Sequence, residues 1–260
     1  MKTDFLKSGK CIIGMVHLKA LPTAPLYRAP YEDIFTRAKE DLEALQEGGA
    51  HAAIIENFYD MPYWTECGTE TLVAMANLVT RLKEIAKIPL GVNIQFGCAK
   101  EEVAVAAICG AAFIRCENFA ESRGGSFGMA PASAGIVMRA KKQLDSECLV
   151  FADVNVKHSV PAYPGQTIDE SIQESMDSGA DAVIVTGLVT GKSPELSDII
   201  ALREKFPHVP LIIGSGVKKE NIKDFLRCAE GVIVGTSLKS QKDGETYIDI
   251  AKVKELVAAV

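Results

Sequence analysis

Two short turns made of glycine and hydroxyl residues lie near the carboxyl end of the sequence. GSG at 214–216 follows the apolar run LII, and GTS at 235–237 follows the apolar run VIV. Glycine lets a backbone approach a ligand closely, and exposed N–H groups in such turns donate hydrogen bonds to phosphate oxygens. Lys239 follows the second turn and could add a positive charge. We therefore predict a site for phosphate or another small oxyanion, with ligand-free tight turns as the alternative.

A third turn bounded by glycines, TGLVTG at 186–191, follows the apolar run that begins at Ala182. It could lie over the same ligand. The predicted phosphate-binding residues are Gly187, Gly191, Gly214, Ser215, Gly216, Gly235, Thr236 and Ser237.

Charged and amide side chains recur toward the ends of the other apolar runs. Side chains alternate between the two faces of a strand, so LVFADVNV at 149–156 has one wholly apolar face, suited to a layer of helices. That face carries Val150, Ala152, Val154 and Val156. The opposite face carries Phe151, Asp153, Asn155 and Lys157. By the same count, Val92, Ile94, Ile114 and Cys116 face outward. A further set then faces inward: His17, Glu56, Asn93, Gln95, Phe113, Arg115, Glu117 and Thr186.

This inward polar set suits acid–base chemistry. Buried charges are costly unless they are paired, so several in one place indicate binding or catalysis. For any single residue, the alternative is a hydrogen-bonded group that closes the inner layer. The predicted catalytic residues are Asp153, Lys157, Glu56, His158, Arg115, Glu117, Asn93 and His17.

Proton transfer between carbons, as in sugar-phosphate isomerisation, needs a base and an acid within reach of the substrate. Asp153 and Glu56 are the candidate bases. Lys157 or His158 could supply the acid or stabilise an enolate. Lys157 could instead form a Schiff base, or simply a salt bridge with Asp153.

No cofactor is predicted. Metal-ligand types do occur among the candidates, but the sequence contains no H-x-H or H-E-x-x-H spacing. A divalent metal therefore stays open, with His17, Glu56, Asp60, Asp153 and His158 as the possible ligands. His51 and His208 are expected on the surface or in turns.

Eight short apolar or β-branched runs, each followed by a helical pattern, must position these residues. The expected strands are 11–17, 52–57, 90–95, 112–117, 149–156, 182–187, 211–215 and 232–236. The expected helices are 32–47, 69–86, 99–109, 133–144, 168–178, 195–206, 218–228 and 249–258. Eight βα units predict a single (β/α)₈ barrel domain over residues 1–260, with its site at the carboxyl ends of the strands. A doubly wound open sheet is the structural alternative.

The composition and charge of the chain limit the classes of partner that we expect. The 260-residue chain has a net charge of −6 and no basic tail, so nucleic acid is not an expected partner. Its seven cysteines contain no C-x-x-C, and its start lacks an apolar signal-peptide core. The longest nearly apolar run, at 103–114, is too short to span a bilayer. We expect a cytoplasmic homo-oligomer, with peripheral membrane association left open.

Several segments together resemble the BtpA/SgcQ family, from about residue 11 to residue 250. The most specific are DVNVKH at 153–158 and the paired GSGV and GTSLK, and GMVHLKALPTAP and IIENFYDMPY support them. The resemblance implies a (β/α)₈ barrel. It also implies a link to photosystem I biogenesis, or to members labelled as similar to phosphoribosylanthranilate isomerase. The chain departs from the family at 115–119, where RCENF replaces a segment like RVNVHTG.

Two functions remain open from the sequence. The first is an isomerase or lyase that acts on a phosphorylated small molecule, such as a sugar phosphate or a nucleotide-like compound. The second is a non-catalytic assembly or regulatory factor of the photosystem biogenesis type, which binds a ligand or a partner protein.

Overall fold

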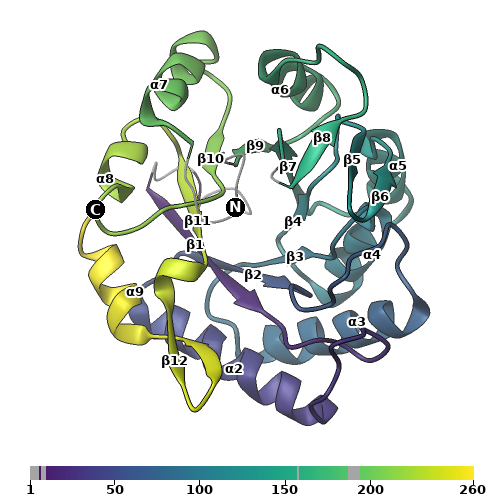
Figure 1. The fold of residues 1–260 in the computed structure, drawn as a ribbon, viewed down its shortest axis with the longest axis vertical. Coiled ribbons are helices and arrows are strands. Elements are labelled where there is room, and N and C mark those ends of the chain that lie inside the picture. Colours follow the sequence, from purple (N-terminus) through teal and green to yellow (C-terminus); the bar gives the residue numbers. More distant parts are fainter. Residues whose placement is uncertain (1–5, 7–9, 157, 187–193) are drawn as a thin grey trace.

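Eight parallel strands close into a barrel in a computed structural model, which describes residues 6, 10–156, 158–186 and 194–260 (Figure 1). Around the barrel the order is β1-β11-β10-β9-β7-β4-β3-β2, and β1 closes the ring by pairing Cys11 with Gly231 of β11. The (β/α)₈ prediction is confirmed, and the closed ring excludes the open sheet. The barrel strands are β1 (Cys11–His17), β2 (Ala52–Glu56), β3 (Leu90–Asn93), β4 (Phe113–Cys116), β7 (Leu149–Val154), β9 (Ala182–Val185), β10 (Leu211–Ile213) and β11 (Gly231–Val234).

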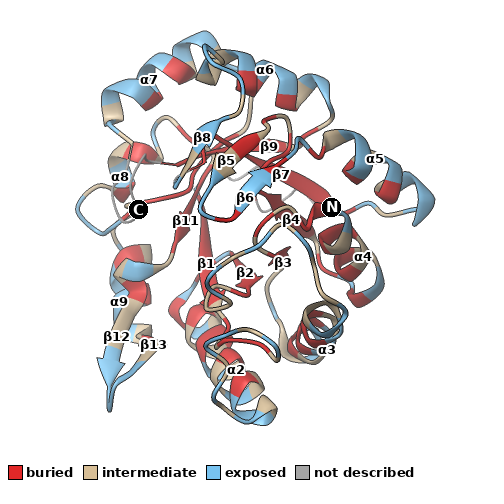
Figure 2. Cartoon of the chain, turned by 45° about the vertical axis from the view of Figure 1, so that its right-hand side comes forward, coloured by how far each residue is buried: buried red, intermediate tan, exposed pale blue. Residues whose placement is uncertain are grey.

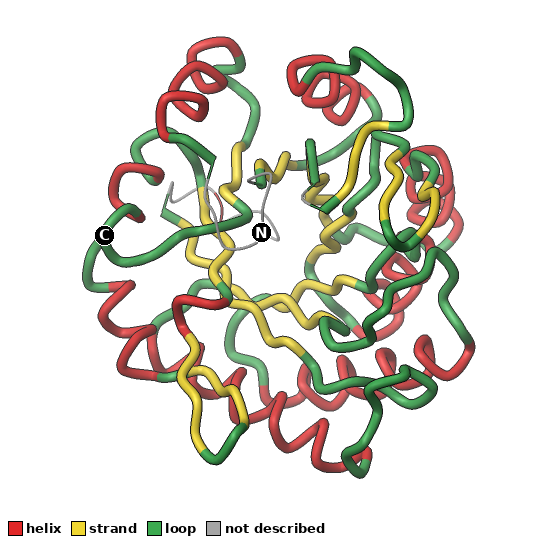
Figure 3. Tube along the Cα trace, viewed as in Figure 1, coloured by secondary structure: helices red, strands yellow, loops and turns green. Residues whose placement is uncertain are grey.

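Helices form an outer ring around these strands (Figure 3). In the first helix, Ile34, Ala38, Leu42 and Leu45 are buried at the spacing of one helical face. In the described parts of the chain the helices are α2 (Tyr31–Gly48), α3 (Thr69–Ile85), α4 (Ala99–Cys109), α5 (Ala134–Gln143), α6 (Ile168–Asp177), α7 (Leu196–Lys205), α8 (Ile222–Phe225) and α9 (Ile250–Val257). None of these is long and apolar enough to cross a membrane.

One predicted helix is much shorter than expected. The pattern at 218–228 predicts a helix, yet α8 has only four residues. The Asn221 side chain accepts a hydrogen bond from the Lys218 N–H at 2.8 Å and donates to the Gly216 carbonyl at 3.1 Å. These bonds hold 216–221 in a turn, because an asparagine side chain can replace the helical partners of the backbone.

The strand faces separate two apolar layers, as alternation predicts. Phe113 and Phe151 stack inside the barrel with ring centroids 4.6 Å apart. Glycine at position 91 makes room for them, since a Cβ there would lie 2.2 Å from the Phe113 ring. The predicted outward residues pack between strands and helices: Val92, Ile94, Ile114, Cys116, Val150, Ala152 and Val154. Figure 2 shows the barrel strands as buried and the outer helix surfaces as exposed.

The prediction for Val156 is wrong. β7 ends at Val154, and Asn155 has a φ of 50°, so strand alternation stops before residue 156. Val156 packs with Phe96, Phe127 and Ala130 instead of joining the helix layer.

Two small sheets were not predicted. Strands β5 (Arg123–Gly125), β6 (Gly128–Ala130) and β8 (Ser159–Pro161) form an antiparallel sheet in the order β6-β5-β8. This sheet joins the expected loop after β4 to the segment after β7. β12 (Lys239–Lys242) and β13 (Glu245–Ile248) form a hairpin between β11 and α9.

Candidate functional site

The carboxyl ends of the first three barrel strands bring polar side chains into one row. His17 ends β1, Glu56 ends β2 and Asn93 ends β3, and the strand register aligns His17 with Glu56 and Glu56 with Asn93. Residues aligned in this way on parallel strands point to the same face of the sheet. The three predicted positions therefore share one level of the barrel mouth.

Arg115 of β4 connects this row to β7. Its Nε donates to Asp153 Oδ2 at 2.8 Å and one Nη donates to Asp153 Oδ1 at 3.3 Å, while the other Nη lies 3.9 Å from Glu56 Oε1. Both partners and the arginine are almost fully buried. Burial lowers the pKa of Arg115, but the negative charge of Asp153 outweighs it and raises the pKa above its ordinary value. The guanidinium stays charged and holds two carboxylates in place.

Glu56 lies at the centre of the network. Its Oε1 accepts a hydrogen bond from Gln95 at 2.6 Å, and its Oε2 lies 3.1 Å from His17 Nε2. Burial raises the pKa of Glu56, but the hydrogen bond and charge of His17, with Arg115 and Gln95, lower it overall to about 2. Glu56 is therefore ionised at neutral pH and is a weak base there.

His17 is held on three sides. Its ring stacks on Phe58 with centroids 4.2 Å apart and planes 9° from parallel. Nε2 faces Glu56, and Nδ1 lies 2.6 Å from the Lys239 ammonium. When the imidazole is neutral, this arrangement favours the tautomer in which Nε2–H donates to Glu56 and Nδ1 accepts from Lys239.

A third carboxyl group reaches the mouth from the helix layer. Glu102 of α4 accepts from the Ile94 N–H at 2.7 Å and from Asn93 Nδ2 at 3.1 Å. Burial raises the pKa of Glu102 well above its ordinary value. Among the described residues, Glu102 Oε2 and Asn93 Oδ1 have no hydrogen-bond partner. Sequence reasoning missed Glu102, because an acidic residue in the first turn of a helix is an ordinary helix feature.

Lys239 is the other residue that sequence reasoning undervalued. Its position after the GTS turn suggested only an added charge, yet the fold brings it against His17 at the first strand. No spacing in the sequence connects two residues so far apart, so only the closed barrel reveals this contact.

The glycine turns lie side by side at the ends of β10 and β11. The Ser237 hydroxyl donates to the Val217 carbonyl at 2.7 Å, which joins the two turns directly. A Cβ at Gly235 would lie 3.6 Å from His17 Cε1. The second turn therefore also borders the row of His17, Glu56 and Asn93, which we call the charged row.

Two of these glycines have structural reasons of their own. A Cβ at Gly214 would come within 2.4 Å of Ile184 and 2.7 Å of the Thr186 methyl group. Gly216 has a φ of 68°, a conformation that favours glycine. Packing and backbone geometry thus account for these two residues, and Ser215 is buried beside them.

The remaining predicted residues fall into different places. Glu117 is buried directly after β4. Burial raises the pKa of Tyr63, and the negative charges of Glu56 and Glu117 raise it further. His158 is exposed in the turn before β8. Lys157, Gly187 and Gly191 lie outside the described residues.

A polar cluster anchors the small sheet next to the mouth. Arg123, of which 1% is exposed, donates to Glu121 at 2.7 Å and to the Ser159 hydroxyl at 2.6 Å. Glu121 in turn accepts from the Asn155 N–H at 3.0 Å. Phe96 and Phe127 stack beneath with centroids 4.1 Å apart. The loops after β3, β4 and β7 are thereby fixed together.

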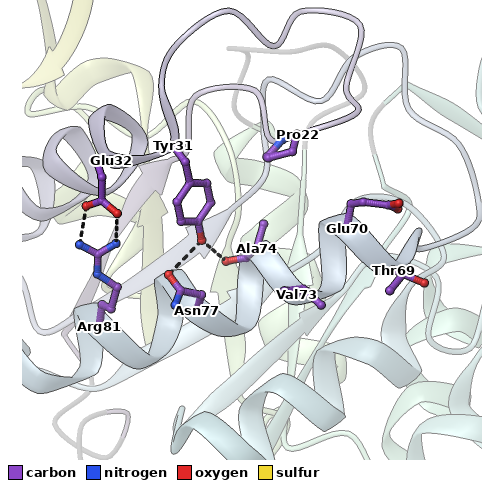
Figure 4. A pocket seen from close by; sticks show the side chains of 9 residues that line it. All are labelled: Pro22, Tyr31, Glu32, Thr69, Glu70, Val73, Ala74, Asn77 and Arg81. Carbon is purple, nitrogen blue, oxygen red and sulfur yellow. Dashed lines mark hydrogen bonds and ion pairs between the residues drawn. The ribbon is translucent and has the colours of Figure 1, made fainter.

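Cavities open on the surface formed by the described residues, and two of them are compared with the site. One, of about 600 Å³, opens between the end of β1 and the β12–β13 hairpin, and His17, Phe58, Thr236 and Lys239 are among its lining residues. The other, of about 670 Å³, is a groove between α2 and α3, shown in Figure 4 with the Glu32–Arg81 ion pair at one end. The lining of the groove contains none of the predicted site residues, whereas the hairpin cavity adjoins the site through His17 and Thr236.

The candidate metal ligands are not gathered into one group. Over the described ranges, no three or more His, Cys, Asp and Glu side chains are placed to hold a metal ion. Asp60, one of the candidates, accepts from the Leu21 N–H at 2.7 Å and from Asn57 at 3.0 Å, so it fixes a loop.

Comparison with known proteins identifies relatives over nearly the whole chain. The model of the BtpA family matches residues 8–260. An uncharacterized protein of Archaeoglobus fulgidus is 35% identical over 250 residues, covering 96% of this chain and 98% of that protein. The photosystem I biogenesis protein BtpA of Synechocystis is 32% identical over 252 residues, covering 96% and 87%.

Solved structures share the fold at low sequence identity. N-(5'-phosphoribosyl)anthranilate isomerase from Pyrococcus furiosus has a TM-score of 0.57 at 16% identity, covering 96% of this chain and 98% of that one. The (S)-3-O-geranylgeranylglyceryl phosphate synthase of Thermoplasma acidophilum, in complex with sn-glycerol-1-phosphate, has a TM-score of 0.60 at 13% identity, covering 99% and 96%. These likenesses concern the barrel fold alone.

Proposed function

The chain belongs to the BtpA family, and from that premise we propose that it is an enzyme acting on a phosphorylated small molecule at the barrel mouth. The observation that carries this proposal is the network of buried Glu56, Arg115 and Asp153 with partly buried His17, which borders the glycine turn after β11. A barrel needs no such charges for its stability, because buried ion pairs contribute little net free energy of folding. Preorganised charges at a mouth suit catalysis.

The phosphate group would bind at the turns after β10 and β11. Thr236 is exposed there, and Ser215 lies at the end of the neighbouring strand. The names of two barrels of the same fold, the phosphoribosyl isomerase and the glycerol phosphate synthase, fit a phosphorylated ligand of this kind. The substrate class we propose is a sugar phosphate or a nucleotide-like compound.

The reacting part of the substrate would lie over the charged row. His17 is the proposed proton carrier, because the ordinary pKa of an imidazole lies closest to neutral pH. Glu56 would position His17 rather than act as a base, since its pKa is about 2. Arg115 would stabilise negative charge that develops on the substrate, and Asp153 remains a second candidate base. The proposed reaction class is isomerisation or a lyase reaction.

A ligand screen tests the binding part of this proposal. Thermal stability is measured against phosphorylated sugars, nucleotides and divalent metal ions. A ligand at about 100 times its dissociation constant stabilises the fold by roughly 2.7 kcal/mol. The double variant Ser215→Asp/Thr236→Asp, which repels phosphate, should lose this stabilisation. If no phosphorylated compound shifts the unfolding temperature of the well-folded protein, phosphate binding is refuted.

A second function is favoured by one relative, the photosystem I biogenesis protein of Synechocystis. In that function the barrel binds a ligand or a partner protein without converting anything. The Asp153→Asn and His17→Gln variants separate the two possibilities once a ligand is known. An enzyme should lose turnover while binding largely survives, whereas a binding factor should show no turnover in either form.

A further inference from the structure

The cavity between β1 and the β12–β13 hairpin has an unusual charge for this protein. The chain as a whole carries a net charge of −6. Yet the lining of this cavity, all within the described residues, contains Lys239, Lys252 and His17 and no carboxylate. Three hydroxyl residues, Thr236, Ser240 and Thr246, also line it, and of these the Ser240 hydroxyl donates to Asp249 at 2.8 Å. A cavity with cations and hydroxyl donors but no acidic side chain suits an oxyanion.

Lys239 is placed to use its charge on a ligand. Some other described lysines pair with carboxylates, as Lys19 does with Glu245 at 2.6 Å, and Lys252 donates to the Lys239 carbonyl at 2.5 Å. Among the described residues, Lys239 instead contacts His17 Nδ1 at 2.6 Å and lies 6.0 Å from the centre of the Phe58 ring. Burial lowers its pKa, while Asp41 and Glu56 raise it from a longer range. A partly buried ammonium group without a carboxylate partner gains free energy when an anion binds beside it.

We propose that this cavity is a second oxyanion subsite, in which Lys239 and Lys252 bind a phosphate or carboxylate group. Thr236 lines the cavity and also belongs to the turn after β11, so this subsite and the proposed phosphate turn are neighbours. The inference rests on the proposed function in one respect, since the two sites together make the natural ligand a small molecule with two anionic groups. Candidate classes are sugar bisphosphates and phosphorylated acids.

The position of the subsite also gives it a link to the charged row. Lys239 contacts His17, and His17 contacts Glu56, so an anion on Lys239 lies two side chains away from the centre of the network. Lys239 is thus a binding residue, and His17 is the group through which an occupied subsite would affect the proton chemistry.

Calorimetric titration of the full chain with inorganic phosphate, and separately with malonate, tests the proposal at constant ionic strength. The wild-type protein should show two binding events for phosphate. Lys239→Met should weaken one of them about tenfold or more, because a charge-assisted contact is lost. Ser215→Asp should remove the other event and leave the Lys239-dependent one. Lys254→Met is the matched control, since it removes the same charge from an exposed position of α9.

The variants distinguish this inference from the proposed function. If Ser215→Asp abolishes all phosphate binding and Lys239→Met changes nothing, the hairpin subsite is refuted and the phosphate turn stands. If only the Lys239-dependent event exists, the phosphate turn is refuted and the subsite stands. An absence of binding in the wild type refutes both. Malonate binding that depends on Lys239 would assign the subsite to carboxylates, and phosphate binding alone would assign it to phosphoryl groups.

A purely structural role of Lys239 is tested separately. In that role the lysine only attaches the hairpin to β1. Lys239→Arg, which keeps the charge, would then recover the stability lost in Lys239→Met but would not bind an anion. The subsite predicts that Lys239→Arg binds phosphate more tightly than Lys239→Met. Lys239 can be acylated with an amine-reactive acylating reagent, and the rate of its modification followed by mass spectrometry. Phosphate should slow this modification. Unchanged acylation, together with equal binding by both variants, would overturn the proposal.

Discussion

The two halves of the barrel mouth present their polar groups by different means. In the half formed by β1, β2, β4 and β7, buried side chains contact one another, as Arg115 does with Asp153 and Glu56. In the half formed by β10 and β11, the turns present backbone and small hydroxyl groups. The buried charges of the first half, which we call the charged half, must be paired, because an unpaired buried charge costs several kcal/mol. In the second half, which we call the glycine half, packing and backbone conformation determine where glycine is needed. Its polar groups therefore depend less on contacts with one another.

The largest expected effect comes from breaking the central ion pairs. Arg115→Met removes the buried guanidinium that contacts Asp153 and Glu56, and should lower the free energy of unfolding by about 3–5 kcal/mol. Denaturation in urea measures this. Arg227→Met is the control, because Arg227 forms an exposed ion pair with Asp224 and should cost less than about 0.5 kcal/mol. Equal losses in the two variants would show that the charged half is no more dependent on pairing than the surface.

The second effect is a dependence of stability on pH. The pKa of Glu56 is about 2 in the fold, against an ordinary value of 4.5. A depressed pKa of an acid gives stability that is full above pH 4.5 and is lost as the pH falls toward 2. The loss amounts to about 3 kcal/mol at most.

Glu56→Gln should therefore flatten the decline of the unfolding free energy between about pH 4.5 and pH 2, measured by urea denaturation at several pH values. Glu204→Gln, at an exposed position of α7, should leave the decline as it is in the wild type. Parallel curves for Glu56→Gln and the wild type would contradict the low pKa.

The third effect belongs to the glycine half. Gly214→Ala places a Cβ against Ile184 and Thr186, and overpacking of this kind should cost about 1–3 kcal/mol of stability. Gly216→Ala should cost about 1–2 kcal/mol for a different reason, the left-handed backbone at this residue. Urea denaturation gives both values. Wild-type stability of Gly214→Ala would mean that β9 and β10 can separate, and that packing does not explain this glycine.

The smallest effect separates two adjacent hydroxyl groups. Ser237→Ala removes the hydrogen bond to the Val217 carbonyl and should cost about 1 kcal/mol. Thr236 is exposed and its side chain has no hydrogen-bond partner among the described residues, so Thr236→Ala should change stability by less than about 0.5 kcal/mol. The same denaturation curves measure both. If both variants lose the same free energy of unfolding, the Ser237 hydroxyl is no more important for stability than the Thr236 hydroxyl, and the two cannot be divided into a structural group and a group available to a ligand.

Much of the site could be predicted because strand alternation is a local rule. Counting along each run placed Glu56, Asn93, Arg115 and Asp153 at one end of a barrel, and the register confirms the alignment of Glu56 with Asn93. Alternation failed at Val156, where a positive φ at Asn155 ends the strand. The helix at 218–228 was overestimated because periodicity does not detect the hydrogen bonds of the Asn221 side chain.

The sequence by itself determined the eight βα units, the two faces of each strand and the end of the barrel where polar residues gather. These features depend on neighbours within a few residues. Only the tertiary structure decided the partners: Lys239 against His17, Glu102 against Asn93, and Gly214 against Thr186. Such contacts join residues from different strands, helices and hairpins, and they arise when the barrel closes and the helices dock. The protonation and charge of each group follow from those partners, so the chemistry of the site is a property of the fold.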